Sequence, residues 1–296
     1  MKLNTIIMNI SSIFLIQIII TILFSILATI YDVKKGIVPV KLCYFLLIFG
    51  LMSNLILSLI TNNIKFILAS LISMIITKYV VYLLWKLKMW GGGDVRLFSA
   101  IATVIPLGAN IDFLNIFPQL SIYPFAFSVI INSILVSFPF LVVFLIHLII
   151  KNNVFDNQKD LMITMWNINN LRRIIESSFN RTIPVKDLKE GNIVNNYYFN
   201  DEKIILLINE ADGNLRVYEN HEDDEFKYYF KSLSAGGITE KEMYLLKIMS
   251  AQKFISDSIS IKISFPFTPS ILLGLMIAIF YGDIMFLFTK NLVLVI

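Results

Sequence analysis

Long apolar runs, separated by short polar turns, fill the first half of this chain and return near its C-terminus. A transmembrane helix needs about 20 apolar residues to cross about 30 Å of hydrocarbon, and several of the runs reach that length. The chain is 57% hydrophobic and only 16% charged, whereas soluble domains are about 45–50% apolar and about 25% charged. The sequence therefore predicts an all-α multi-pass membrane protein.

The pattern predicts about six transmembrane helices, with one soluble insertion before the last. The expected spans are Ser12–Tyr31, Val40–Ile60, Ile64–Leu87, Asp94–Leu107, Tyr123–Ile150 and Ser264–Phe288. The first run is longer than the roughly 7–15-residue core of a secretory signal, so we expect it to be retained as a span. Residues 1–150 should hold five helices, 151–262 the insertion, and 263–296 the sixth helix.

The insertion is rich in Asn, Asp, Glu and Lys and predicts a small α+β domain. Lys203–Ile208 and Leu215–Tyr218 favour strands, and the turn residues 211–214 between them predict a hairpin. Thr239 and Glu242 have the spacing of a capping box and predict a helix that runs to about Lys253. The acidic run Glu219–Glu225 is interpreted as a solvated loop, with a site for basic peptides as the alternative.

Charge and composition argue against several other functions. The net charge of +4 fits positive loops at the cytoplasmic face better than nucleic-acid binding. Cys43 is the single cysteine, so the chain has no internal disulfide and no Cys-x-x-Cys zinc module. His147 and His221 lie far apart without a ligand cluster nearby. We therefore expect neither a metal nor a cofactor.

Two aspartates stand at span ends: Asp32 closes the first span and Asp94 opens the fourth. Because successive spans alternate in direction, both lie on one face if the second and third spans cross fully. That face carries more Lys and Arg than the other, namely Lys34, Lys35, Lys41, Lys86, Lys88 and Arg96 with the insertion's basic residues, against Lys2, Lys65 and Lys290. Positive residues favour the cytoplasm. The N-terminus should therefore lie outside, with both aspartates and the insertion at the cytoplasmic face.

Each aspartate alone has an ordinary interpretation. Asp32 could be a helix-end residue, and Asp94 could be an N-cap that accepts bonds from free backbone N–H groups. The glycines Gly91, Gly92 and Gly93 come directly before Asp94. Glycines permit unusual backbone angles and close approach of another chain, so this loop could present Asp94 to an extended peptide, or it could be a flexible linker.

Taken together, the two carboxylates indicate acid–base chemistry. Two carboxyls a few ångströms apart cannot both ionise easily, so the pair holds one proton. The ionised group can take a proton from water while the protonated group polarises a peptide carbonyl. This is the chemistry of an aspartic protease, and it requires no metal or cofactor.

The two aspartate motifs resemble those of the type IV prepilin peptidases, which are Gly-x-Gly-Asp membrane aspartic proteases. The six-span layout, together with residues 184–191, 236–240 and 266–283, is most similar to the archaeal preflagellin peptidase branch. The resemblance implies that Asp32 and Asp94 are the catalytic pair and that Gly91 and Gly93 are motif glycines.

The resemblance also implies the partners: archaellin or type IV prepilin precursors in a lipid bilayer. Their short basic leader is cut at the cytoplasmic face, just before the substrate's hydrophobic helix. Bacterial members often carry a four-cysteine zinc segment and methylate the new N-terminus. This chain lacks those cysteines, so we predict cleavage without methylation.

Two other functions remain open at this stage. A presenilin-like protease that cuts within a transmembrane helix shares the chemistry but should carry its first aspartate deep inside a span. An ion-coupled transporter should carry acids near the bilayer midplane and broken helices in two similar halves.

Overall fold

The structure is a computed structural model that describes residues 2–87, 90–107, 124–151, 179–221, 225–233, 237–263, 265–286 and 289. It divides into two compact units, which we describe separately. The helical unit comprises Met1–Phe140 and Pro266–Ile296, and the insertion unit comprises Leu141–Phe265. The composition had placed these boundaries after residues 150 and 262.

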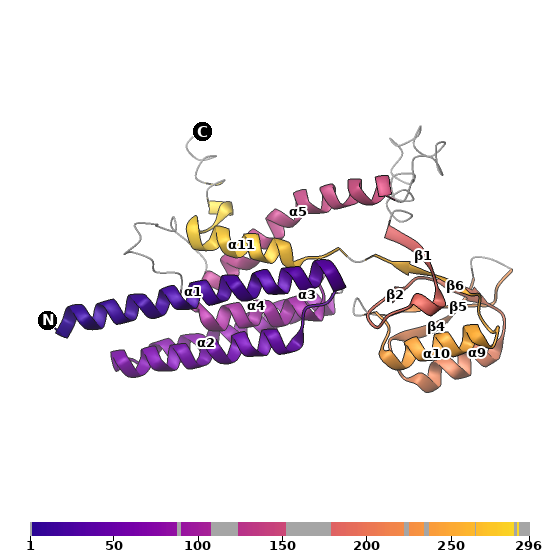
Figure 1. The fold of residues 1–296 in the computed structure, drawn as a ribbon, viewed down its shortest axis with the longest axis horizontal. Helices are drawn as coiled ribbons and strands as arrows, with labels where there is room; N and C mark the ends of the chain where they lie inside the picture. Colours follow the sequence, from indigo (N-terminus) through magenta and orange to yellow (C-terminus); the bar gives the residue numbers. More distant parts are fainter. Residues whose placement is uncertain are drawn as a thin grey trace. The chain divides into compact units, whose positions relative to one another are not determined.

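Six helices carry the apolar runs (Figure 1). Their bounds are α1 Lys2–Lys35, α2 Val40–Thr61, α3 Lys65–Lys86, α4 Gly92–Val104, α5 Phe125–Lys151 and α11 Thr268–Phe280. Within the part of the chain that the structure describes, four segments are long and apolar enough to cross a membrane: Ile10–Lys35, Val40–Thr61, Lys65–Lys86 and Phe125–Ile150. The described parts of α4 and α11 have 13 residues each, or about 20 Å. The six-span count is therefore not confirmed, whereas the mostly helical membrane fold is.

Sharp turns join the first three helices. Gly36 has a φ of 69°, and its N–H donates to the Asp32 carbonyl at 2.7 Å, which ends α1. Asn62 ends α2 with a φ of 48°, in the same left-handed region. Glycine and asparagine are the residues that accept this conformation at a helix C-terminus at least cost. These residues thus end α1 and α2 at the points where a short turn reverses the direction of the chain.

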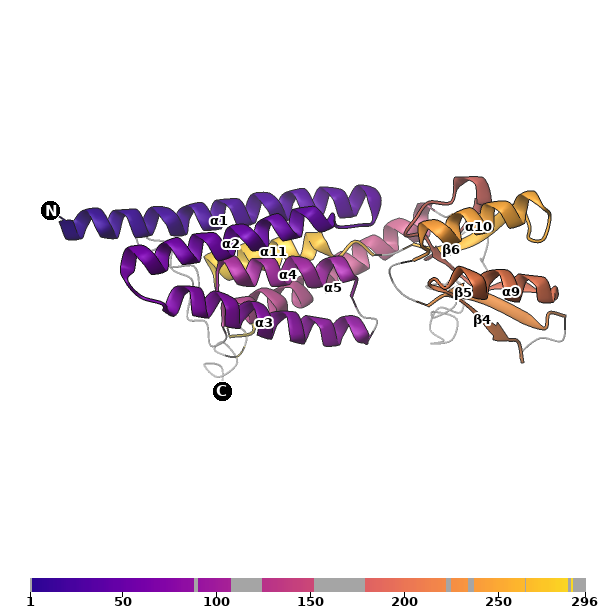
Figure 2. The same ribbon diagram turned by 90° about the horizontal axis from the view of Figure 1, so that it is seen from below.

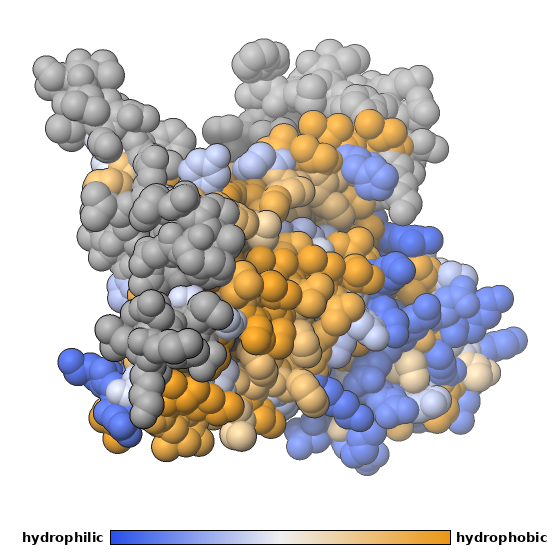
Figure 3. All heavy atoms as spheres, turned by 60° about the vertical axis from the view of Figure 1, so that its left-hand side comes forward, coloured by the Kyte–Doolittle hydropathy of each residue, from blue (hydrophilic) through white to orange (hydrophobic). Residues whose placement is uncertain are grey.

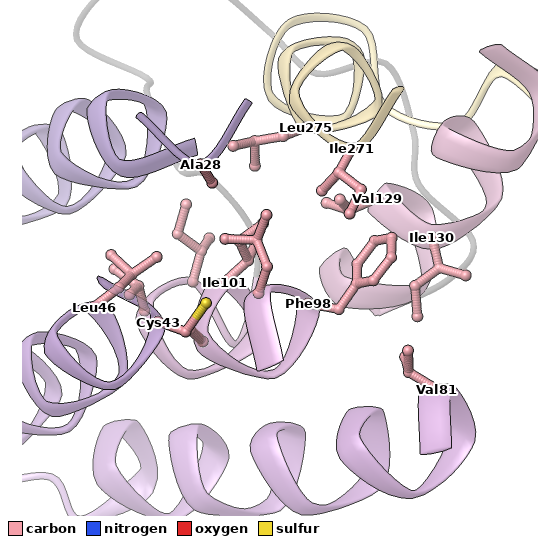
Figure 4. Packing of buried hydrophobic residues seen from close by; sticks show 14 of the residues in the cluster. Ala28, Cys43, Leu46, Val81, Phe98, Ile101, Val129, Ile130, Ile271 and Leu275 are labelled. Carbon is pink, nitrogen blue, oxygen red and sulfur yellow. The ribbon is translucent and has the colours of Figure 1, made fainter. Parts of the chain in front are cut away.

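The short helix α4 is the centre of the helical unit (Figure 2). From Asp94 to Val104 its side chains are buried, with the exception of Arg96. Side chains from α1, α2, α3, α5 and α11 join those of α4 in one apolar cluster (Figure 4). The C-terminal end of α4 is buried as well, and Asn54 donates to the carbonyls of Thr103 and Val104 at 3.0 and 3.2 Å. These bonds satisfy carbonyls that a helix end leaves without partners.

The outer surface of the helical unit carries many large apolar side chains. Phe45 and Leu59 are 70% and 69% exposed, and apolar side chains cover much of the face drawn in Figure 3. In water, such a continuous apolar surface would be strongly unfavourable. A lipid bilayer is the solvent that suits it.

The insertion unit is α+β in its described part. It contains β1 Asn180–Pro184, η2 Val185–Asp187, β2 Ile193–Val194, β3 Tyr197–Phe199, α9 Glu202–Ala211, β4 Leu215–Glu219, β5 Tyr228–Ser232, α10 Glu240–Ala251 and β6 Ser258–Lys262. The strands form two antiparallel three-stranded sheets, ordered β1-β6-β2 and β3-β5-β4. The unit has its own core, which includes Val194, Ile204, Phe230 and Leu246.

One expectation for this unit was wrong. Lys203–Ile208 lies within helix α9 rather than in a strand. The Asp201 carboxylate caps the helix by accepting from Lys203 N–H at 2.9 Å, and Ile204 and Ile208 are both buried. Residues four apart share one face of a helix, so this spacing outweighed the β propensity of the isoleucines. The following turn joins a helix to β4 instead of closing a hairpin.

The capping box at the start of α10 is confirmed. Thr239 Oγ1 accepts from Glu242 N–H at 3.3 Å, and Glu242 accepts from Thr239 N–H at 2.7 Å. The helix ends at Ala251, slightly before the predicted Lys253. Of the acidic run, residues 222–224 lie outside the described residues.

Candidate active site

Asp32 lies in the last turn of α1 and binds the first residue of α11. Its Oδ2 accepts hydrogen bonds from the Thr268 backbone N–H at 3.1 Å and from Thr268 Oγ1 at 2.9 Å. Thr268 is fully buried, and Asp32 itself is partly buried. The carboxylate therefore occupies the N-terminal end of a helix from a distant part of the chain.

Asp94 lies in the first turn of α4, outside the four candidate spans. Its Oδ2 accepts from Gly91 N–H at 3.1 Å, and the residue is 7% exposed. Gly91, not Asp94, is the N-cap of α4, and Asp94 is the third residue of the helix, whose carboxylate accepts from the N–H of that cap. The deep burial of the carboxyl is what an ordinary helix-end role leaves unexplained, since most capping carboxylates stay in contact with water.

The two carboxyls lie close enough to interact electrostatically. Burial, and after it the charge of Asp32, raises the pKa of Asp94 to about 7. Burial acts because a low-dielectric surrounding disfavours the charged form, and a neighbouring negative charge acts in the same direction. Between the ordinary aspartate pKa of about 4 and neutral pH, Asp94 therefore tends to hold a proton that an ordinary aspartate would have lost.

An aromatic stack brings the N-terminal ends of α4 and α11 together. The Trp90 ring stacks on Phe98 with centroids 5.2 Å apart and on Phe267 with centroids 5.1 Å apart. Trp90 directly precedes Gly91, and Phe267 directly precedes Thr268. The stack therefore joins the two segments that deliver hydrogen-bond donors to the aspartates. Sequence reasoning missed Trp90, Phe267 and Thr268, although the first adjoins the glycine run.

The three glycines before Asp94 are not equivalent. A Cβ on Gly91 would lie 3.3 Å from Asp94 Oδ2, and one on Gly93 would lie 2.9 Å from Val38 Cβ. A Cβ on Gly92 would meet nothing nearer than Trp85 Nε1 at 3.7 Å, an ordinary contact. None of the three has a positive φ. Close packing, rather than an unusual backbone angle, is therefore what the first and third glycines provide.

These glycines also belong to ordered structure rather than to a free loop. Gly91 is the N-cap of α4, and Gly92 and Gly93 form its first turn. Gly93 lets Val38, in the turn between α1 and α2, approach the helix closely. Asp32 and Asp94 are thereby held by the same small region. Among the described residues, no group of three or more His, Cys, Asp or Glu side chains could hold a metal ion.

Residues 19–146 match the type IV leader peptidase family. The match spans Asp32, the three glycines and Asp94, and it confirms the family that the two aspartate motifs indicated. It ends within α5 at residue 146, so nearly all of the insertion unit and the whole of α11, with Thr268, lie beyond it.

A related protein is also similar to part of this chain. The prepilin peptidase EppA of Methanothermobacter thermautotrophicus is 33% identical over 139 residues, which is 46% of this chain and 36% of EppA. The chain thus spans little more than a third of that relative's length.

Proposed function

We propose that this protein is a membrane aspartic endopeptidase that removes the short basic leader of type IV prepilin-like or archaellin precursors. The observation that carries the proposal is the pairing of Asp32 with the buried, proton-holding Asp94 at two adjoining helix N-termini. The family match over the same residues supports it, as does the similarity to a protein named prepilin peptidase.

The pair can hydrolyse a peptide bond without any further group. The ionised carboxylate takes a proton from water as the water oxygen attacks the carbonyl carbon, and the protonated carboxyl gives its proton to the carbonyl oxygen. A neutral gem-diol results. One hydroxyl then returns its proton to the carboxylate that had donated, the C–N bond breaks, and the amine takes the proton drawn from water. Both carboxyls are thereby restored.

The expected orientation sets where this reaction occurs. Asp32 and Asp94 are assigned to the cytoplasmic face, with the insertion unit on the same side. Helices α2 and α3 are both among the candidate spans, which is the condition that the alternation of spans required. The substrate's basic leader would lie in the cytoplasm, and its hydrophobic helix would lie in the bilayer. We further propose that the product leaves unmethylated.

The test uses the full chain, reconstituted in lipid nanodiscs, with synthetic precursors that carry a short Lys-rich leader and an apolar helix. Sequencing of the product N-terminus should show one cut, directly before the apolar segment. Mass spectrometry should show no added methyl group. A cut within the apolar segment would instead indicate an intramembrane protease, and intact precursor would contradict the proposal.

The substitutions Asp32→Asn and Asp94→Asn should each lower kcat/KM at least about a thousandfold, because either change removes one member of the acid–base pair. The exposed Asp187 of the insertion unit provides the matched control, since Asp187→Asn makes the same chemical change away from the pair. Unchanged thermal unfolding of the three variants would show that they fold. Normal cleavage by either Asp32→Asn or Asp94→Asn would refute the assignment of the pair.

A further inference from the structure

Thr268 connects Asp32 to a helix that the family match does not reach. Both of its donors, the backbone N–H and the hydroxyl, bind the same carboxylate oxygen at 3.1 and 2.9 Å. The two residues are 236 positions apart in the sequence, and α11 packs along α1 (Figure 1). Only the tertiary packing of α11 against α1 can bring these two residues into contact.

The sequence around Thr268 leaves its N–H in need of an acceptor. The N-cap residue, Phe267, has no side-chain oxygen, and Pro269 has no N–H. The N–H groups of Ser270 and Ile271 bind the Phe267 carbonyl at 3.0 and 3.2 Å. Asp32 thus supplies the cap that α11 lacks, and the positive end of the helix dipole in turn favours a negative carboxylate.

Thr268 is itself fixed against α1. Its carbonyl accepts from Thr29 Oγ1 at 3.3 Å, and Thr29 lies one turn before Asp32 on the same helix. The neighbouring Phe267 is held by its stack on Trp90. The hydroxyl of Thr268, which is fully buried, therefore has little freedom to turn away from Asp32.

The two aspartates differ in what surrounds them. Asp32 is partly exposed and accepts two hydrogen bonds, whereas Asp94 is 7% exposed and accepts one from Gly91. Donors favour the ionised form of a carboxyl, and burial favours the neutral form.

The charged side chains on the helices that pack around the two aspartates do not reverse this difference between Asp32 and Asp94. Lys34 and Lys35 on α1, Lys41 on α2 and Arg96 on α4 are all exposed. Helix α11 carries no charged side chain. The charge of Asp32 acts on Asp94, which lies close to it.

We propose that Thr268 is a positioning residue that favours the ionised form of Asp32 through its two hydrogen bonds, so that Asp32 rather than Asp94 is the base toward water and Asp94 is the acid toward the carbonyl. This inference rests on the proposed leader peptidase function and assigns the two roles within it. It also gives α11 a part in the chemistry, because the N-terminal end of that helix stabilises the base.

The test measures kcat/KM against pH for the reconstituted full chain with the synthetic precursor. Thr268→Val removes the hydroxyl donor at nearly constant volume, and Thr268→Ser keeps it. The acidic limb of this profile reports ionisation of the base in the free enzyme. Loss of a donor to the carboxylate disfavours its ionised form, so in Thr268→Val this limb should move to higher pH by about one pH unit. Thr268→Ser should keep the wild-type midpoint.

Thr21→Val is the matched control, because Thr21 is also fully buried and its hydroxyl bonds only within α1, to the Gln17 carbonyl. Its acidic limb should not move. If Thr268→Val does not fold, Thr268→Ala provides a second variant without the hydroxyl. An equal loss of kcat/KM at every pH, with an unchanged midpoint, would overturn the inference and leave Thr268 a structural residue. Absence of cleavage by the wild-type chain would instead refute the proposed function.

Discussion

At the residue scale, the three glycines before Asp94 differ in whether a side-chain Cβ would fit at their positions. A Cβ on Gly91 or Gly93 would lie tightly against Asp94 or Val38, whereas a Cβ on Gly92 would make only ordinary contacts. The alternating Gly-x-Gly pattern therefore follows from packing at the first turn of α4. The first glycine keeps room for the carboxylate, and the third keeps room for the turn after α1.

Gly93→Ala should destabilise the protein by about 1–3 kcal/mol, the usual cost of overpacking. The added Cβ would push Val38 away, and with it the end of the helix that carries Asp32. Gly92→Ala makes the same change where no clash exists, and alanine is the better helix former. Thermal unfolding in nanodiscs would compare the two. An equal unfolding midpoint for both variants would show that close packing is not why Gly93 is a glycine.

At the scale of elements, the site depends on the meeting of two helix N-termini. The Trp90 ring lies against both α4, through Phe98, and the residue before α11, Phe267. Offset aromatic pairs of this kind contribute about 0.5–1.5 kcal/mol each beyond the area they bury. Without the ring, the segments that hold Asp94 and Thr268 lose the contact that joins them.

Trp90→Ala should therefore cost about 3–5 kcal/mol of stability and most of the cleavage activity, while Trp90→Phe should retain a larger part of both. Trp85 provides the control. It is 38% exposed and contacts Tyr82 in a tilted arrangement with ring centroids 5.2 Å apart, so Trp85→Ala leaves no buried cavity between α4 and α11. Unfolding midpoints and kcat/KM would be measured together. A smaller effect for Trp90→Ala than for Trp85→Ala would contradict this account.

At the scale of the whole molecule, the open question is which face of the bilayer holds the paired aspartates. Lys34, Lys35 and Lys41 lie at their end of the helices, together with Arg96, and positive residues favour the cytoplasm. The turn at Asn62 and Asn63 lies at the other end of α2. Its accessibility from outside the cell would report the orientation.

Cysteine labelling can measure this, because Cys43 is the single native cysteine and is buried. In a Cys43→Ser background, a cysteine replacing the exposed Asn63 should react with a membrane-impermeant maleimide in intact cells. A cysteine replacing the exposed Lys189 of the insertion unit should react only after permeabilisation. The reverse pattern would place the site outside the cell and overturn the proposed cytoplasmic cleavage.

The features that could be predicted from the sequence are those that depend on residues close together in the chain. Length and apolarity identified the four described helices that are long enough to cross a membrane, and a three-residue spacing identified the capping box of α10. The bond between Asp94 and Gly91 is of the same local kind. Local reasoning failed at Lys203–Ile208, where β-branched residues suggested a strand although the spacing of Ile204 and Ile208 is equally that of a helix face. A short segment does not decide between the two periods by itself.

By itself, the sequence determined that this chain forms apolar helices and that two acids stand at their ends, because helix length and helix-end chemistry depend on neighbouring residues. Only the tertiary structure decided what surrounds those acids. The bond from Thr268 to Asp32 crosses 236 positions, and the Trp90 ring reaches Phe267 from another helix. Such contacts arise when packing around α4 brings distant segments together. That packing makes the two carboxyls chemically different from each other.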